Sequence, residues 1–362
     1  MGIAVKYIDI VDRLREEIRA GRYGSRGAFP SETQLLRRFG TSRQTVVRAL
    51  DVLRKEGLII RHKGAGTFLS AAGKRATGRI GLIVHGSDYC EIFAPIAKRI
   101  SVLCQERGYS LLFGDVSSQC TAKRIRKVVD LADRFVEEGV DGVIFQPIEL
   151  VPNAVEVNRE VMTRFDRAGV PVALLDSDIV PGPERSGYDL VSVNHFEVGR
   201  RLATHLRAVG ARRVVYLTQR DRAPCVQARQ LGVKTGCEGM EVPGTAFVGE
   251  PEDEKAIRRL LKRYRPDAIA CYNDRQAALL MQTLSKVGRR VPEDVMVAGF
   301  DDVQVAKLTV PQLTTMHQPC DEIATATIGL LMDRIRNQAI PPRAVVIDAP
   351  LVVRKSTLNL RN

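Results

Sequence analysis

The sequence predicts a small winged helix-turn-helix domain of the α+β class, followed by a large α/β domain with two doubly wound parallel sheets. Three observations predict this: a basic N-terminal segment, three short helical patterns that end in a hairpin pattern, and apolar strand-like runs that then alternate with amphipathic segments. With 362 residues, 44 % hydrophobic and 27 % charged, the chain is long enough for two globular domains.

Positive charge is concentrated at the N-terminus. Residues 1–79 contain 17 Lys and Arg but only seven Asp and Glu, so they carry +10 of the formal charge of +13. A small basic domain joined to a nearly neutral one is typical of a protein that binds a polyanion through one part only. We therefore expect nucleic acid to be a partner of the N-terminal segment.

Three segments of this basic part show apolar residues at helical spacing. Ser31 and Gln34 have the spacing of a capping box that starts the second helix, and Ser42 can cap the third. Gly21, Gly40 and Gly57 mark the ends of the helices. The residues expected to face the core are Ile8, Val11, Leu14 and Ile18; Leu35, Leu36 and Phe39; and Val46, Val47, Leu50 and Leu53.

Two short strands are predicted at 58–61 and 67–69, around a turn at 62–66 with a basic tip. Three helices followed by this hairpin predict a winged helix whose third helix enters the major groove. Its first turns present Arg43, Gln44, Thr45 and Arg48, residue types that contact base edges and phosphates. A solvated charged helix face is the alternative, which the basic hairpin and the local charge make weaker.

The stretch 70–79 is rich in small and basic residues and lacks apolar periodicity, so it is predicted to be a linker between domains 1–69 and 80–362. Beyond it, strand-like runs alternate with helical patterns, as parallel sheets with crossover helices require. The predicted strands are 80–84, 110–113, 142–145, 170–175, 191–193, 214–217, 245–248, 268–271 and 295–298. Their number favours two lobes, with a ligand site at the carboxyl ends of the strands.

Polar residues follow several of these strands, while no catalytic or metal-binding motif does. Asn273 and Asp274 follow one strand, Asp301 and Asp302 another, and Asp176 a third. Such groups suit a polyhydroxylated ligand, although Asn and Asp are also common as helix caps and in turns. The seven cysteines form no C-x-x-C pair and are expected to be reduced thiols in the core.

The N-terminal motifs closely resemble the DNA-binding domain of the gluconate-repressor (GntR) family. The resemblance runs from Tyr7 to Phe68 and rests on Phe-Pro-Ser-Glu at 29–32, Thr-Ser-Arg-Gln-Thr-Val at 41–46, Glu-Gly-Leu at 56–58 and Gly-Ala-Gly-Thr-Phe at 64–68. It implies operator contacts from the start of the second helix, the start of the third helix and the wing. The implied residues are Ser31, Arg43, Gln44, Thr45, Arg48, His62, Lys63 and Gly64.

The second domain resembles the ligand-binding core of the lactose-repressor (LacI) family, a fold shared with periplasmic sugar-binding proteins. The motifs are Cys-Tyr-Asn-Asp at 271–274, Ala-Gly-Phe-Asp-Asp at 298–302, Pro-Gln-Leu-Thr-Thr at 311–315, and 350–357. The resemblance implies dimerisation through this domain and effector contacts from Arg229, Asn273, Asp274, Asp301 and Gln318, with His85, Tyr89 and Asp176 in further loops. Asn194-His195, where an Asp-Asn pair is usual, and the absence of Trp depart from the family pattern.

Together the resemblances imply a cytoplasmic homodimeric repressor of carbohydrate-utilisation genes. It would bind a palindromic double-stranded operator and be released by a small sugar-like effector. No cofactor, metal, catalytic residue or membrane segment is expected. A purine or other non-sugar ligand, and a ligand acting as corepressor, remain alternatives. An exported sugar-binding protein would have no use for the basic domain, and a glycoside hydrolase would need two carboxylates at a defined separation, for which the sequence gives no sign.

Overall fold

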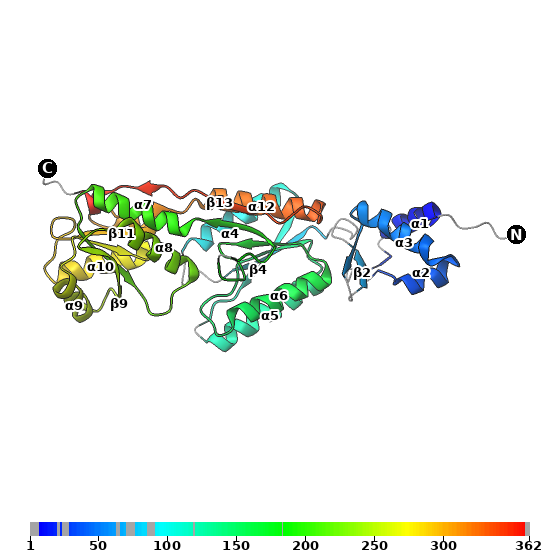
Figure 1. The fold of residues 1–362 in the computed structure, drawn as a ribbon, viewed down its shortest axis with the longest axis horizontal. Coiled ribbons are helices and arrows are strands. Elements are labelled where there is room, and N and C mark those ends of the chain that lie inside the picture. Colours follow the sequence, from blue (N-terminus) through cyan, green and yellow to red (C-terminus); the bar gives the residue numbers. More distant parts are fainter. Residues whose placement is uncertain are drawn as a thin grey trace. The chain divides into compact units, whose positions relative to one another are not determined.

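The computed structural model describes residues 7–19, 22–23, 29–62, 66–69, 77–84, 91–118, 120–182 and 184–358. The chain divides into two compact units (Figure 1). Unit 1 comprises Met1–Val191 and Ala324–Val345, and unit 2 comprises Ser192–Ile323 and Val346–Asn362. The predicted linker falls largely outside the described residues, so the domain boundaries at 69 and 80 stay predictions.

The N-terminal part forms the predicted winged helix. Its elements are α1 (Tyr7–Arg19), α2 (Glu32–Phe39), α3 (Arg43–Lys55), β1 (Ile59–His62) and β2 (Gly66–Leu69), with β1 and β2 antiparallel. The capping box at Ser31 is present, and α2 ends at Gly40 in the left-handed conformation at φ 56°. Local sequence signals therefore set these helix boundaries.

Two of the residues predicted to face this core do not. Ile8 is 51 % exposed, and Ile10 takes its place as a fully buried residue. On α3, Val47 is only half-buried and Ala49 fills the core instead. In both helices the spacing of apolar residues allows two overlapping stripes, and the one that meets the neighbouring helices is selected by packing.

Unit 1 also contains a six-stranded sheet in the order β13-β7-β6-β5-β3-β4. Strands β3 to β7 pair in parallel, as the apolar runs predict. The strands are β3 (Arg79–Val84), β4 (Ser110–Asp115), β5 (Gly142–Phe145), β6 (Val172–Leu175), β7 (Asp189–Val193) and β13 (Ala344–Ile347). The helices that accompany them are α4 (Phe93–Glu106), α5 (Thr121–Glu137) and α6 (Ala154–Ala168).

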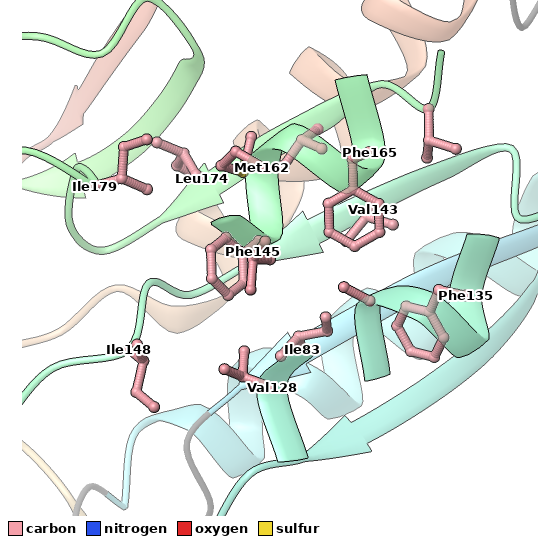
Figure 2. Packing of buried hydrophobic residues seen from close by; sticks show 14 of the residues in the cluster. Ile83, Val128, Phe135, Val143, Phe145, Ile148, Met162, Phe165, Leu174 and Ile179 are labelled. Atoms are coloured by element: carbon pink, nitrogen blue, oxygen red, sulfur yellow. The ribbon is translucent and has the colours of Figure 1, made fainter. Parts of the chain in front are cut away.

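One face of this sheet packs against α5 and α6. Figure 2 shows Phe135 from α5 and Phe165 from α6 beside Val143 and Phe145 of the central strand β5. These side chains are at most 2 % exposed. A continuous apolar layer of this kind fixes the strand ends, from which the polar loops of the unit project.

Unit 2 repeats the architecture with the order β14-β12-β11-β10-β8-β9. Its described elements are α7 (His195–Ala208), β8 (Arg213–Thr218), α8 (Pro224–Gly236), β9 (Val242–Val248), α9 (Glu254–Tyr264), β10 (Ala268–Cys271), α10 (Asp274–Lys286), β11 (Met296–Asp301), α11 (Gln304–Leu308), β12 (Thr314–His317), β14 (Leu351–Val352) and the 3-10 turn η1 (Lys355–Thr357). A long helix, α12 (Cys320–Arg336), follows β12, and its residues from Ala324 onward belong to unit 1. The sequence analysis had not predicted β12, β13, β14 or α12.

The cysteines and the helices can be compared with what the sequence predicts for them. Cys104, Cys237 and Cys271 are buried free thiols, but Cys120 is exposed, so the expectation that all cysteines lie in the core is wrong. Cys90 lies outside the described residues. Among the helices of the described ranges, none combines the length and the apolar character needed to cross a bilayer.

Helices α7 and α8 of unit 2 approach each other closely because glycines lie at their contact. A Cβ atom on Gly199 would lie 2.1 Å from the carbonyl oxygen of Arg229, and one on Gly232 would lie 1.9 Å from that of Phe196. Both contacts are with backbone atoms, which cannot rotate away. Glycine at these positions therefore sets the depth at which α8 holds Arg229.

We predict that Gly232→Ala lowers the thermal midpoint of unfolding, because forcing the helices apart costs about 1–3 kcal/mol. Gly329→Ala is the control, since nothing lies within 4 Å of a Cβ at this exposed helical position. That variant should be neutral or slightly stabilising. Circular dichroism melts of both variants test this, and equal midpoints would contradict the close-packing argument.

Candidate DNA-binding surface and effector site

The start of α3 is held by its cap. Ser42 Oγ accepts a hydrogen bond from the Thr45 backbone N–H at 3.3 Å, and the two hydroxyl oxygens lie 2.8 Å apart. The next side chains are free to reach outward: that of Arg43 is 80 % exposed, and Gln44 is exposed as well. A rigid helix start with exposed Arg and Gln side chains is the geometry that major-groove readout requires.

The Glu32 carboxylate joins three elements of the winged helix. It lies at the start of α2, its Oε2 is 3.4 Å from Arg43 Nε on α3, and its Oε1 accepts a hydrogen bond from Arg61 on β1. Ser31, the residue before it, is occupied by the cap of α2. Glu32 thus orients Arg43 and links the third helix to the wing, a role that the sequence analysis missed.

The other predicted DNA contacts are only partly described. The Arg48 guanidinium is exposed and lies over the Tyr7 ring at 4.4 Å, which keeps the side chain extended on the surface of α3. His62 is the last residue of β1, and its contact with DNA stays a prediction. Lys63 and Gly64 at the wing tip lie outside the described residues, so their contacts stay predictions.

In unit 2, the buried Arg229 guanidinium organises the carboxyl ends of the parallel strands. Its Nε donates to His195 Nδ1 at 3.2 Å, and its Nη1 donates to the Tyr272 carbonyl at 3.1 Å. Its Nη2 lies 3.4 Å from Asp301 Oδ1, and the guanidinium carbon lies 5.1 Å from the centre of the Phe300 ring. Arg229 and Asp301 are only 5 % and 6 % exposed, so the pair is held within the protein.

The neighbouring acidic and amide side chains are not equivalent. Asn273 Oδ1 caps α10 by accepting from the Gln276 N–H at 2.9 Å, which leaves its amide nitrogen without a hydrogen bond in the described part of the chain. Asp274 is fully buried, and its two oxygens accept from Thr315 Oγ1 at 2.5 Å and the Val303 N–H at 3.0 Å. This geometry supports a ligand contact by Asn273 and a supporting role for Asp274.

Asp302, next to the predicted contact Asp301, is also committed within unit 2. Its carboxylate lies 3.0 Å from His317 Nδ1 and 2.6 Å from Arg354 Nη2. Both aspartates have positive φ angles, 110° and 56°, which turn the chain sharply after β11. The turn separates their side chains, so that Asp301 meets Arg229 while Asp302 meets Arg354.

Besides Asp301 Oδ1, which faces Arg229, further buried oxygens of unit 2 lack a hydrogen-bond partner among the described residues. They are Gln318 Oε1, Thr218 Oγ1 and Tyr216 Oη. Gln318 was predicted as an effector contact, whereas Thr218 and Tyr216 were missed because they lie inside or at the end of an apolar strand. Unpaired buried polar atoms are costly, and a ligand with hydroxyl groups would satisfy them.

In unit 1, Asp176 follows β6 with φ 73°, and its negative charge disfavours the ionised form of the Glu149 carboxyl. Burial, with a further contribution from Asp176, raises the pKa of Glu149 to about 7. Glu149 Oε1 has no hydrogen-bond partner among the described residues. Glu149 was not among the predicted contacts, and its signal was its place just after β5. His85 and Tyr89, predicted as contacts, lie outside the described residues.

Comparison with known proteins agrees with this division. Residues 6–69 match the model of bacterial regulatory proteins of the gntR family, and residues 203–357 match the model of the periplasmic binding protein-like domain. The chain is a transcription regulator with a GntR-type DNA-binding domain and a LacI-type, periplasmic-binding-protein-like domain. This regulator therefore has the two-part architecture that its sequence predicts.

Among its relatives are two that match nearly the whole regulator and a third that matches most of it. It is 26 % identical to the arabinose metabolism transcriptional repressor of Geobacillus stearothermophilus over 368 residues, which cover 97 % of both chains. Identity to the protein of the same name from Halalkalibacterium halodurans is also 26 %, covering 99 % and 98 % of the two chains. The PurR repressor of Vibrio atlanticus is 28 % identical over 79 % of the regulator and 83 % of that protein.

Solved structures show the same fold. The regulator CelR in complex with cellobiose has a TM-score of 0.65 at 24 % identity, covering 87 % of this chain and 90 % of that one. A LacI family regulator from Enterococcus faecium with bound ribose has a TM-score of 0.63 at 21 % identity, covering 78 % and 100 %. At these identities the likeness supports the fold and carries no assignment of a ligand.

The Asp274 carboxyl predicts a pH dependence of stability. Burial, with a smaller contribution from Asp301, raises its pKa from 3.8 to about 8. Because the folded state then holds a proton that the unfolded state releases above pH 4, this contribution to stability declines as the pH rises toward 8. We expect urea midpoints of the wild type to fall from pH 6 to pH 9, and Asp274→Asn to fall less steeply. Parallel slopes would contradict the raised pKa.

Proposed function

We propose that the regulator is a homodimeric repressor that binds a palindromic operator and is released when a sugar binds at the carboxyl ends of the strands of its second domain. Release by the ligand is the direction that the sequence predicts. One observation in unit 2 carries the effector proposal: a buried, fully oriented guanidinium lies against a buried carboxylate, in a unit that also contains a buried amide oxygen without a partner, Gln318 Oε1.

The chemistry of that cluster suits a polyhydroxylated ligand. Arg229 is held by His195, Tyr272 and Asp301, so little conformational entropy is lost when it donates to a ligand oxygen. Asn273 offers N–H donors and Gln318 offers an acceptor, which matches the dual donor and acceptor character of a hydroxyl group. Two relatives of nearly full length are named arabinose metabolism repressors, which makes L-arabinose the first ligand to test.

On the DNA side, we propose that Arg43, Gln44, Thr45 and Arg48 contact base edges and phosphates, with Ser31 and the wing residues His62, Lys63 and Gly64 on the backbone. The exposed start of α3 supports this assignment. The excess positive charge of residues 1–79 supports an affinity that falls with salt. Dimerisation would pair two such surfaces on one duplex.

Selection from random duplex DNA by the full-length chain tests the proposal. A palindromic consensus is expected, and the selected duplex then serves as the operator. Titration of the complex with L-arabinose, other pentoses, hexoses, sugar phosphates, sugar acids and purines gives the ligand class and the sign. Release by one sugar supports the proposal. A response only to a purine, or tighter operator binding with ligand, would replace it with the corresponding alternative.

We predict that Arg43→Ala weakens operator binding by about 1–3 kcal/mol and relaxes the base preference at one position of each half-site. Arg54→Ala is the matched control, because Arg54 lies in the last turn of the same helix, is exposed and pairs with Asp51 at 3.1 Å. Fluorescence anisotropy with the selected operator and single-base variants measures both effects. Equal losses for the two variants would count against base readout by Arg43.

We predict that Arg229→Lys abolishes the ligand response, because lysine lacks the planar, bidentate donors of the guanidinium. Operator affinity without ligand should stay within about twofold of the wild type, since lysine keeps the positive charge beside Asp301. The ligand-induced shift of the thermal midpoint should disappear at the same time. An unchanged shift and response would show that the effector binds elsewhere.

A further inference from the structure

The buried Asp141 carboxylate anchors the chain just after the predicted linker. Its Oδ1 accepts from the Thr77 N–H at 2.9 Å, and its Oδ2 accepts from the N–H groups of Gly78 at 2.8 Å and Arg79 at 3.4 Å. Asp141 is only 7 % exposed and lies immediately before β5. One side chain thus receives three consecutive backbone donors.

Further contacts hold the same three residues. Thr77 Oγ1 donates to the Gly139 carbonyl at 3.0 Å, and the Gly78 carbonyl accepts from the Ser110 N–H at 2.6 Å. The Arg79 guanidinium lies 2.9 Å from Glu138 Oε2. Gly78 has φ 69°, a conformation that turns the chain just before β3 begins. The path of residues 77–79 is therefore fixed from several sides.

Unit 2 contains an equivalent aspartate, Asp267, at a place where no linker enters. Asp267 lies immediately before β10, and its Oδ2 accepts from the N–H groups of Arg212 and Arg213 at 2.9 Å each. In both units the backbone N–H of the aspartate donates to the first strand residue at 2.8 Å, Arg79 in unit 1 and Arg213 in unit 2. Arg79 and Gly78 of unit 1 therefore correspond to Arg213 and Arg212 of unit 2.

The correspondence shows what is special in unit 1. The residue equivalent to Thr77 is Ala211, whose N–H donates to the Leu206 carbonyl of α7 at 3.0 Å and not to Asp267. In unit 2 the incoming chain is thus held by its own helix. In unit 1 the incoming chain arrives from the DNA-binding domain, and Asp141 reaches one residue further, to Thr77, to hold it.

We propose that Asp141 is a positioning residue that fixes the direction in which the linker leaves the effector domain, and thereby sets the spacing of the two DNA-binding domains in the dimer. The inference rests on the proposed function for the dimer and its paired half-sites. A fixed exit direction raises the effective concentration of the second DNA-binding domain at its half-site. The hydrogen bonds of Asp141 to residues 77–79 would also transmit a movement of unit 1 to the linker.

The test compares Asp141→Asn with Asp267→Asn in the full-length chain. Each replaces an anchoring carboxylate oxygen by an amide donor, so each should lower stability, but only the first loosens the linker. The probes are the selected duplex with two half-sites and a duplex with one half-site. Asp141→Asn is expected to keep the wild-type affinity for one half-site and to lose about tenfold of the preference for two. Asp267→Asn should keep that preference.

Limited trypsin digestion gives a second readout that needs no DNA. Cleavage after Lys74 and Arg75, the basic residues before Thr77, should accelerate in Asp141→Asn and not in Asp267→Asn. If Asp141→Asn does not fold, Thr77→Val removes only the hydroxyl bond to Gly139 and should show the same two effects at smaller size.

The outcomes separate the two proposals. An unchanged preference and cleavage rate in Asp141→Asn, or equal changes in Asp267→Asn, would overturn the positioning role. A wild type with no preference for paired half-sites would overturn the dimeric operator model, and the cleavage rates would still decide the role of Asp141.

Discussion

The organisation of unit 2 depends on one buried cation. Arg229 reaches His195 at the start of α7, Tyr272 after β10 and Asp301 at the end of β11, so a single guanidinium connects elements far apart in the sequence. Burying such a group is costly unless it is paired with acceptors, as Arg229 is with His195, Tyr272 and Asp301. The glycine contact between α7 and α8 makes this possible, because it brings α8 deep enough for the side chain to arrive.

In both sheets an aspartate side chain holds the backbone where the chain enters the first strand. Each has an aspartate directly before a buried central strand, Asp141 or Asp267, whose carboxylate accepts from backbone N–H groups where the chain enters the sheet's first strand. Backbone N–H groups that precede a strand lack ladder partners, so a carboxylate there satisfies several at once. The difference between the copies lies where function differs, at the one entry that carries a DNA-binding domain.

How much the sequence could predict varied with how local the signal was. The winged helix follows from caps and glycine stops within a few residues, and the predicted starts of α2 and α3 were confirmed. The core stripe was misplaced at Ile8 and Val47 because tertiary contacts choose between overlapping apolar faces. Strand β12 (Thr314–His317) was missed because Thr and His interrupt its apolar run, and β14 because it has only two residues that pair with β12. In these segments non-local packing decides.

The candidate site shows the same limit at the level of atoms. Adjacent residues such as Asn273 and Asp274, or Asp301 and Asp302, look equivalent in sequence but differ in their contacts. Asp301 lies against Arg229, and Asn273 keeps an amide nitrogen without a hydrogen bond in the described part of the chain. Asp274 and Asp302 instead bind the Val303 N–H and Arg354. Positive φ angles at Asp301 and Asp302 make that choice. The motif predicts where polar groups gather. Which of them remain available to a ligand follows only from burial and from the hydrogen bonds already made, since Asp274 is fully buried and both its oxygens already accept.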